Sequence, residues 1–242
     1  MVYRRFLSFL LLLFLLMSTT SFLPKVVNEK KELKNKMSLN GDEELNIEQV
    51  YHNLHSEGFG LPRLESFKMA LQGFNKLKTQ GLVTKNILTL IDFSLSANVK
   101  RLWVIDLDTE TILLHSLVAH GKNTGDEYAN SFSNKAESFK SSLGFYITAE
   151  VYNGKHGKSL RLDGLEKGIN DNARNRAVVV HGANYVSDAF IQNNKRLGRS
   201  LGCPAVPLEI TDGLINTIKN KSCLFIYYPS ESYLRSSKFI QS

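Results

Sequence analysis

The sequence contains only two cysteines, Cys203 and Cys223, and this scarcity excludes a scaffold held together by many disulfides. A single disulfide between the two stays open, but their surroundings argue against it. Cys223 begins the alternating, aromatic run CLFIYYP, which is typical of a buried strand, whereas Cys203 stands between a glycine and a proline in a loop. We therefore expect Cys223 in the core and Cys203 as a presented thiol.

Other features are also missing. The chain has no internal repeat, no nucleic-acid-binding module and no basic stripe interleaved with aromatic residues, so nucleic acid is not an expected partner. His52 and His55 have a spacing that suits a metal ion, but no further cluster of ligands accompanies them. Positions on a helix surface are therefore favoured for both residues, and we expect no metal site.

An apolar run long enough to span a membrane is absent from the N-terminus. The run from Phe6 to Met17 has twelve residues, and a spanning helix needs roughly 18 to 20. It follows two arginines and precedes small residues, which is the pattern of a secretory signal peptide, predicted here at 1–21. A single membrane anchor is the second interpretation. No cysteine stands nearby for lipid attachment, so we expect an exported protein in the periplasm or cell wall of a bacterium, without a stable membrane anchor after cleavage.

The charge balance fits this location. The formal net charge is +7 at pH 7, and it falls to +5 without residues 1–21, which carry two arginines and no acid. A mildly basic exported protein suits a polyanionic surface such as a cell wall.

Residues 22–44 are polar and charged, and we predict a flexible linker there. Residues 45–86 form an N-terminal helical segment. Behind Pro62, apolar residues recur at spacings of three and four until Gly81, which predicts an amphipathic helix. The residues of this stripe are Leu64, Phe67, Leu71, Phe74 and Leu77. A shorter helix is expected around Leu45 to Leu54.

From Ile87 onward the pattern alternates, and turn signals become frequent, so we predict a mainly β catalytic domain over 87–230 and a C-terminal tail over 231–242. Strands are predicted at Arg101 to Asp106, Thr111 to Val118, Phe145 to Tyr152, Leu160 to Leu162, Arg176 to Val180 and Leu224 to Tyr228. Short helices fit Ser187 to Asn193 and Thr211 to Lys219. The stretch from Gly121 to Ser142 is predicted to be a long functional loop.

Two segments carry a thiol and an imidazole that together could form a nucleophile and its base. RAVVVHGANYVSD places His181 at the end of an apolar strand, directly before Gly182, and GRSLGCPAVP carries Cys203 on a glycine-containing loop. A thiol becomes a nucleophile when an oriented imidazole takes its proton. Successive amides at Leu201, Gly202 and Cys203 are candidates for donating to an oxyanion.

These two segments resemble the L,D-transpeptidases of peptidoglycan, which carry His-Gly, a spacer, and then Ser/Thr-His-Gly-Cys. The chain looks like a divergent branch, the exported murein L,D-transpeptidase catalytic-domain proteins, over about residues 99–228. SSLGFYITAEVYNGKHGKSLRLDGLEKGINDNA and VAHGKNTGDEYANSFSN add to the resemblance. It implies an L,D-transpeptidase-like β-sandwich or open barrel with short helices.

The resemblance also implies roles. Cys203 would be the nucleophile, His181 its base, and the Gly182 carbonyl the group that orients the imidazole. Amides around Gly202 and Cys203 would form the oxyanion hole. The implied reaction is attack on the third residue of a peptidoglycan tetrapeptide stem, release of D-alanine, and transfer to an acceptor amine as a 3,3 cross-link. It requires no metal and no organic cofactor.

Two positions depart from the common pattern: Leu201 replaces a histidine, and Ala205 replaces an asparagine. We interpret the missing histidine as a supporting group, because the activating base in the family is the earlier one.

Further residues are candidates for contact with substrate: Arg199, Ser200, Asn184, Tyr185 and His156. A guanidinium at Arg199 suits a carboxylate of the stem, with a solvated loop charge as the alternative. Ser200 lacks the surroundings of a nucleophile, and a structural hydroxyl is the better interpretation. Tyr185 fits either the cleft or the core. His120 and His156 fit either the rim of the site or an ordinary loop, and His115 fits a strand.

Three alternatives frame the function. A papain-like protease has its cysteine before its histidine, which is the reverse of the order here. An L,D-carboxypeptidase would share the acyl-enzyme and finish with water. A non-catalytic wall-binding module would be favoured by a disulfide between Cys203 and Cys223.

Overall fold

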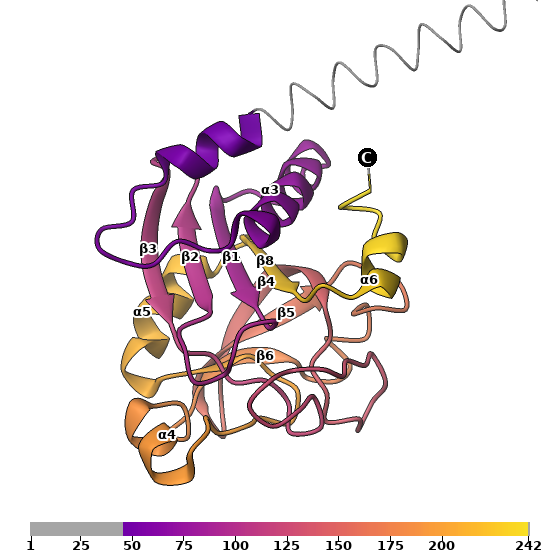
Figure 1. The fold of residues 1–242 in the computed structure, drawn as a ribbon. Coiled ribbons are helices and arrows are strands. Elements are labelled where there is room, and N and C mark those ends of the chain that lie inside the picture. The colour runs from indigo at the N-terminus through magenta and orange to yellow at the C-terminus, as the bar shows by residue number, and fades with distance from the viewer. Residues whose placement is uncertain (1–45, 242) are drawn as a thin grey trace, which may run out of the picture. The chain divides into compact units, whose positions relative to one another are not determined.

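A mixed sheet of eight strands organises the chain in the computed structural model, which describes residues 46–241 (Figure 1). The predicted signal peptide and linker lie outside the described residues. The strands are β1 (Ile87–Asp92), β2 (Leu102–Asp106), β3 (Thr111–Ser116), β4 (Gly144–Gly154), β5 (Gly157–Gly164), β6 (Val179–Gly182), β7 (Ala205–Val206) and β8 (Cys223–Tyr227).

The sheet order is β3-β2-β1-β8-β4-β5-β6-β7. The pairs β1/β8 and β6/β7 are parallel, and the others are antiparallel. The residues that follow β3 return to the opposite end of this order, because Ala119 forms a bridge with Ala205 of β7. The two ends of the sheet therefore meet, which gives the mainly β architecture that the sequence pattern predicted and the open barrel that the resemblance implied.

Helices cover parts of this sheet. Residues 46–53 are helical, and α3 (Leu64–Thr79), α4 (Asp188–Asn194), α5 (Leu208–Ile218) and α6 (Glu231–Ser236) follow. The predicted apolar stripe of α3 is buried from Phe67 to Leu77, and the helix packs against β1 and β8. The helical segment and the strands share one core, which runs from Ile47 to Phe239. None of the helices in residues 46–241 combines the length and the apolarity that crossing a membrane requires.

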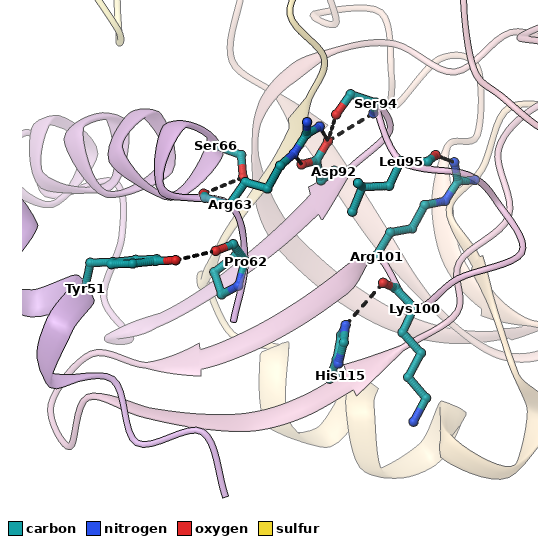
Figure 2. Close-up of polar contacts among 10 residues, drawn as sticks. All are labelled: Tyr51, Pro62, Arg63, Ser66, Asp92, Ser94, Leu95, Lys100, Arg101 and His115. Atoms are coloured by element: carbon teal, nitrogen blue, oxygen red, sulfur yellow. Dashed lines mark hydrogen bonds and ion pairs between the residues drawn. The ribbon is translucent and has the colours of Figure 1, made fainter. Parts of the chain in front are cut away.

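An ion pair between a half-exposed arginine and a buried carboxylate fixes the segment before α3 to the sheet (Figure 2). Arg63 Nε donates to Asp92 Oδ2 at 3.1 Å, and this carboxylate lies fully buried at the end of β1. The Ser94 amide donates to Asp92 Oδ1 at 3.0 Å, and the Tyr51 hydroxyl donates to the Pro62 carbonyl at 2.8 Å. These bonds hold the helical segment against β1.

The structure corrects several predicted boundaries. The strand predicted from Arg176 begins only at Val179, because Ala177 takes a left-handed conformation with a φ of 54°. The prediction omitted β1 and the two-residue strand β7. The predicted C-terminal tail contains α6, and its Tyr233 hydroxyl donates to the buried carboxylate of Glu166 at 3.1 Å.

Candidate active site

The segment that carries Cys203 is held between two neighbours. On one side, His181 of β6 pairs with Ala205 of β7 in parallel register, so Cys203 lies two positions before the partner of His181. On the other side, Ala119 pairs with Ala205 and Gly121 with Ser200. Ala119 and Ala205 belong to a small buried apolar cluster whose other members are Ala97, Leu117, Ala183, Val186 and Leu197. The fold thus places Cys203 two residues before β7, and β7 pairs with the strand β6 that carries His181.

His181 is buried, with an exposed fraction of 3%, and its orientation is fixed. Its Nδ1 lies 2.9 Å from the Gly182 carbonyl oxygen, so Nδ1 carries the proton and Nε2 keeps its lone pair. Gly182 has no room for a side chain, because a Cβ would lie 2.4 Å from Thr211 Oγ1 of α5. Burial lowers the pKa of His181 below its usual 6.5, more strongly than the bond to Gly182 raises it. The imidazole is therefore a neutral, oriented base at pH 7.

His156 covers the ring of His181. It stands in the turn between β4 and β5, where Gly154 pairs with Gly157. The two imidazole rings are stacked, with centroids 4.5 Å apart and planes inclined by 25°. Positive charge on His156 adds to the lowering of the His181 pKa. The fold therefore brings His156 into the site.

Cys203 is a partly exposed residue with a free thiol, and the free Cys223 in β8 is buried, so the structure contains no disulfide between them. Cys203 Sγ donates to the carbonyl of Ala177 at 3.6 Å. Burial of the sulfur raises the pKa of Cys203, whereas the Val179 amide and the charge of Arg176 lower it. The resting thiol is therefore protonated at neutral pH.

Hydrogen bonds shape the turn around the thiol. Ser200 Oγ donates to the Cys203 carbonyl at 2.6 Å and accepts from the Gly202 amide at 3.0 Å. Gly202 has a φ of +126°, which favours glycine. Its amide is already engaged, and this removes one of the three predicted oxyanion donors. The amides of Leu201 and Cys203 donate to no other residue in the described part of the chain.

The remaining predicted contact residues are placed differently. Arg199 turns to the loop at 122–126, where Nη1 donates to Asp126 Oδ1 at 2.6 Å. Asn184 is exposed beside β6. Tyr185 is half-buried and packs against Gly198, and burial, with a smaller contribution from negative charge on Cys203, raises its pKa to about 12. Leu201 lies in the loop that carries Cys203 and is 59% exposed.

Sequence reasoning missed Arg176. Its Nη1 donates to the Ser133 carbonyl at 2.8 Å and to Ser142 Oγ at 2.5 Å. Its Nη2 donates to the Lys140 carbonyl at 2.5 Å and to Ser138 Oγ at 3.4 Å. All four acceptors belong to the predicted long loop, which the structure confirms as a connection without helix or strand. The only signal in the sequence was an arginine just before the strand that leads to His181.

The other histidines lie in the sheet, in the core or on the surface. His115 stacks on Trp103 within the sheet, with ring centroids 4.7 Å apart, as the strand prediction required. His120 is buried, and its Nδ1 accepts from Arg101 Nη2 at 2.8 Å. His52 and His55 are exposed. Among residues 46–241, no cluster of three or more histidine, cysteine or acidic side chains is arranged to hold a metal ion.

Comparison with known proteins assigns the chain to a family. The family model described as "L,D-transpeptidase catalytic domain" matches residues 62–227, which is more than half of the chain. No curated protein matches.

Several solved structures resemble the chain at low identity. An L,D-transpeptidase from Mycobacterium smegmatis is 12% identical, with a TM-score of 0.37, and the match covers 59% of each chain. The L,D-transpeptidase of Xylanimonas cellulosilytica is 13% identical, with a TM-score of 0.35, over 76% of this chain and 93% of that one. An Enterococcus faecium L,D-transpeptidase is 11% identical, with a TM-score of 0.34, over 59% and 50%. The chain spans about three fifths of the first of these.

Proposed function

This chain belongs to the L,D-transpeptidase catalytic-domain family, and from that premise we propose that it is a cysteine-dependent L,D-transpeptidase acting on peptidoglycan stem peptides. Its proposed place of action is the cell wall or periplasm, after export directed by the signal peptide predicted at 1–21.

One arrangement carries the proposal. His181 is fixed as a neutral base by its bond to the Gly182 carbonyl, and Cys203 lies as a free thiol two residues before β7, the strand that pairs with β6. Positioned proton transfer of this kind contributes typically 10²- to 10⁴-fold to a rate. The carbonyl of Gly182 takes the place of the acid in a catalytic triad, because it orients the imidazole without adding charge.

The proposed reaction proceeds in two halves. His181 Nε2 takes the proton of Cys203 as the sulfur attacks the carbonyl carbon of the third stem residue. The negative oxygen that forms is stabilised by the amides of Leu201 and Cys203, which are the donors left after Gly202 bonds to Ser200. The carbon–nitrogen bond to D-alanine then breaks, and His181 returns the proton to the departing amine.

The thioester on Cys203 is then attacked by an amine of a neighbouring stem. His181 takes a proton from this amine, the carbon–sulfur bond breaks, and the thiol is restored with its proton. The product is a 3,3 cross-link. If water replaces the amine, the same thioester gives a tripeptide, which is the carboxypeptidase outcome.

The test is incubation of the purified protein with muropeptides that carry tetrapeptide stems, followed by mass spectrometry. We expect a cross-linked dimer, free D-alanine and a covalent adduct on Cys203. Cys203→Ala should lower D-alanine release by at least about 10³-fold while the circular dichroism spectrum stays unchanged. Tripeptide without dimer would replace the transpeptidase by a carboxypeptidase. Unchanged substrate and no adduct would contradict both activities.

A further inference from the structure

Arg176 connects two parts of the chain that surround the nucleophile. It stands three residues before β6, and its guanidinium reaches the segment at 133–142 through the four hydrogen bonds described above. Two of the acceptors are backbone carbonyls, so the bonds fix the course of the loop itself. The arginine therefore acts as a clamp on this segment.

The same segment packs against the turn that holds Cys203. A Cβ on Gly202 would lie 2.9 Å from the Lys140 carbonyl oxygen and 3.3 Å from Arg176 Nη2. The Gly202 carbonyl also accepts from Ser141 Oγ at 3.2 Å. The loop, the guanidinium and the glycine before the nucleophile are thus in mutual contact.

Local backbone geometry places Arg176 there. The Val178 amide donates to the Ala173 carbonyl and the Ala177 amide donates to the Arg174 carbonyl, both at 3.0 Å. This is the Schellman pattern, with Ala177 as its left-handed residue. The turn points the carbonyl of Ala177 at Cys203 Sγ. One turn therefore sets both the arginine and the hydrogen-bond acceptor of the thiol.

The positive charge of Arg176 also affects the protonation of Cys203. Burial favours the neutral forms of both Cys203 and His181, and His156 and Tyr185 are the other titratable groups beside them. Among the groups that act on the sulfur, Arg176 is the one with a full positive charge at neutral pH. Its charge favours the thiolate that must form during attack.

We propose that Arg176 is a positioning residue, which clamps residues 133–142 onto Gly202 and holds its positive charge beside this glycine, the residue directly before Cys203. The inference rests on the proposed role of Cys203 as nucleophile. Lysine cannot replace this arginine fully, because a single ammonium cannot meet four acceptors in the geometry of a planar fork.

The test is the rate at which iodoacetamide alkylates Cys203 as a function of pH. The thiolate forms a carbon–sulfur bond and iodide leaves, so the rate follows the thiolate fraction, and Cys223 is fully buried. We expect Arg176→Gln to slow alkylation at pH 7 by about tenfold and to move the midpoint of the profile up by about one pH unit. Amide hydrogen exchange of residues 133–142 should accelerate in the same variant.

Two variants separate charge from clamping. Arg176→Lys should keep the midpoint of the wild-type profile but accelerate exchange in the loop. Arg174→Gln is the matched control, because Arg174 pairs with Asp163 and Glu150 on the exposed face of β4 and β5. It should change neither the midpoint nor the exchange.

The proposal is overturned if folded Arg176→Gln matches the wild type in both measurements, or if Arg174→Gln shifts the profile equally. If Arg176→Gln does not fold, unchanged loop exchange in Arg176→Lys overturns the clamp. Alkylation needs no substrate, so the expected shift without turnover of muropeptides would refute the proposed function and leave the role of Arg176 standing.

Discussion

At the scale of single residues, burial shifts the pKa values of the two central groups of the candidate site, His181 and Cys203, in opposite directions. It lowers the pKa of His181 and raises the pKa of Cys203, and both shifts favour a neutral imidazole beside a neutral thiol. We infer that the proton moves from sulfur to Nε2 as the substrate is attacked, and not in the resting enzyme. A substitution that changes the pKa of His181 should therefore shift the pH profile of activity.

His156 is the residue that tests this inference. A base must be neutral to act, so the lowered pKa of His181 extends activity to more acidic pH than an ordinary histidine would. His156→Ala removes a stacked cover and a nearby charge, and both losses raise the pKa of His181. We expect the acid limb of kcat/KM for D-alanine release to move to higher pH. His156→Phe keeps the cover and should move it less. An acid limb that moves to lower pH in His156→Ala would contradict the stacking argument.

At the scale of elements, the sequence predicted regular structure where its signals were local. The stripe of α3 and the hairpin of β2 and β3 appear close to their predicted bounds, and the helix predicted from Ser187 begins one residue later. Ser187 itself is the N-cap of this helix, and its side-chain oxygen accepts a hydrogen bond from the Phe190 amide at 3.2 Å. Local chemistry of this kind can be read without tertiary structure.

Other elements depend on contacts that no local pattern encodes. The strand β7 has only two residues, and it exists because Ala205 has neighbours on both sides, at His181 and Ala119. In the site, the pairing of His181 with Gly182 was predicted from the resemblance, and its bond is present. Arg176 was missed because its acceptors lie in a loop without periodicity.

The turn before β6 allows a prediction about stability. Ala177 occupies the left-handed position of the Schellman pattern, where a Cβ costs about 1–2 kcal/mol, and glycine removes that cost. The unfolded chain gains freedom worth about 0.5–1 kcal/mol with glycine. We expect Ala177→Gly to raise the free energy of unfolding by about 0.5–1 kcal/mol, measured by urea denaturation. Ala173→Gly, which replaces a buried residue earlier in the same turn, should destabilise the protein. A loss of stability in Ala177→Gly would contradict the argument from φ.

At the scale of the whole molecule, two buried basic residues, Arg101 and His120, connect the core to the loop of the candidate site. Arg101 is fully buried, and its guanidinium donates to the carbonyl of Val118 and to His120 Nδ1. Its contact with the Leu95 carbonyl at 2.9 Å appears in Figure 2. The His120 carbonyl accepts from the Ser200 amide at 2.9 Å. His120 thus links the buried Arg101 to the loop that carries Cys203.

This pair makes stability depend on pH. Burial, and then the charge of Arg101, lower the pKa of His120 from 6.5 to about 4. Because the folded pKa lies below the unfolded one, the stability that neutral His120 contributes is present above pH 6.5 and is lost as pH falls toward 4. Between pH 7 and pH 4.5 this loss is roughly 2 to 3 kcal/mol.

A variant isolates this contribution from the other acids and bases. His120→Gln keeps an acceptor for Arg101 and a donor for the Gly125 carbonyl, and it cannot take up a proton. Urea unfolding at pH 7 and pH 4.5 should show a drop smaller by roughly 2 to 3 kcal/mol in His120→Gln than in the wild type. His52→Gln, at an exposed helical position, serves as the control and should behave as the wild type does. Equal drops in all three proteins would mean that folding does not lower the pKa of His120, which would contradict the argument from burial and the charge of Arg101.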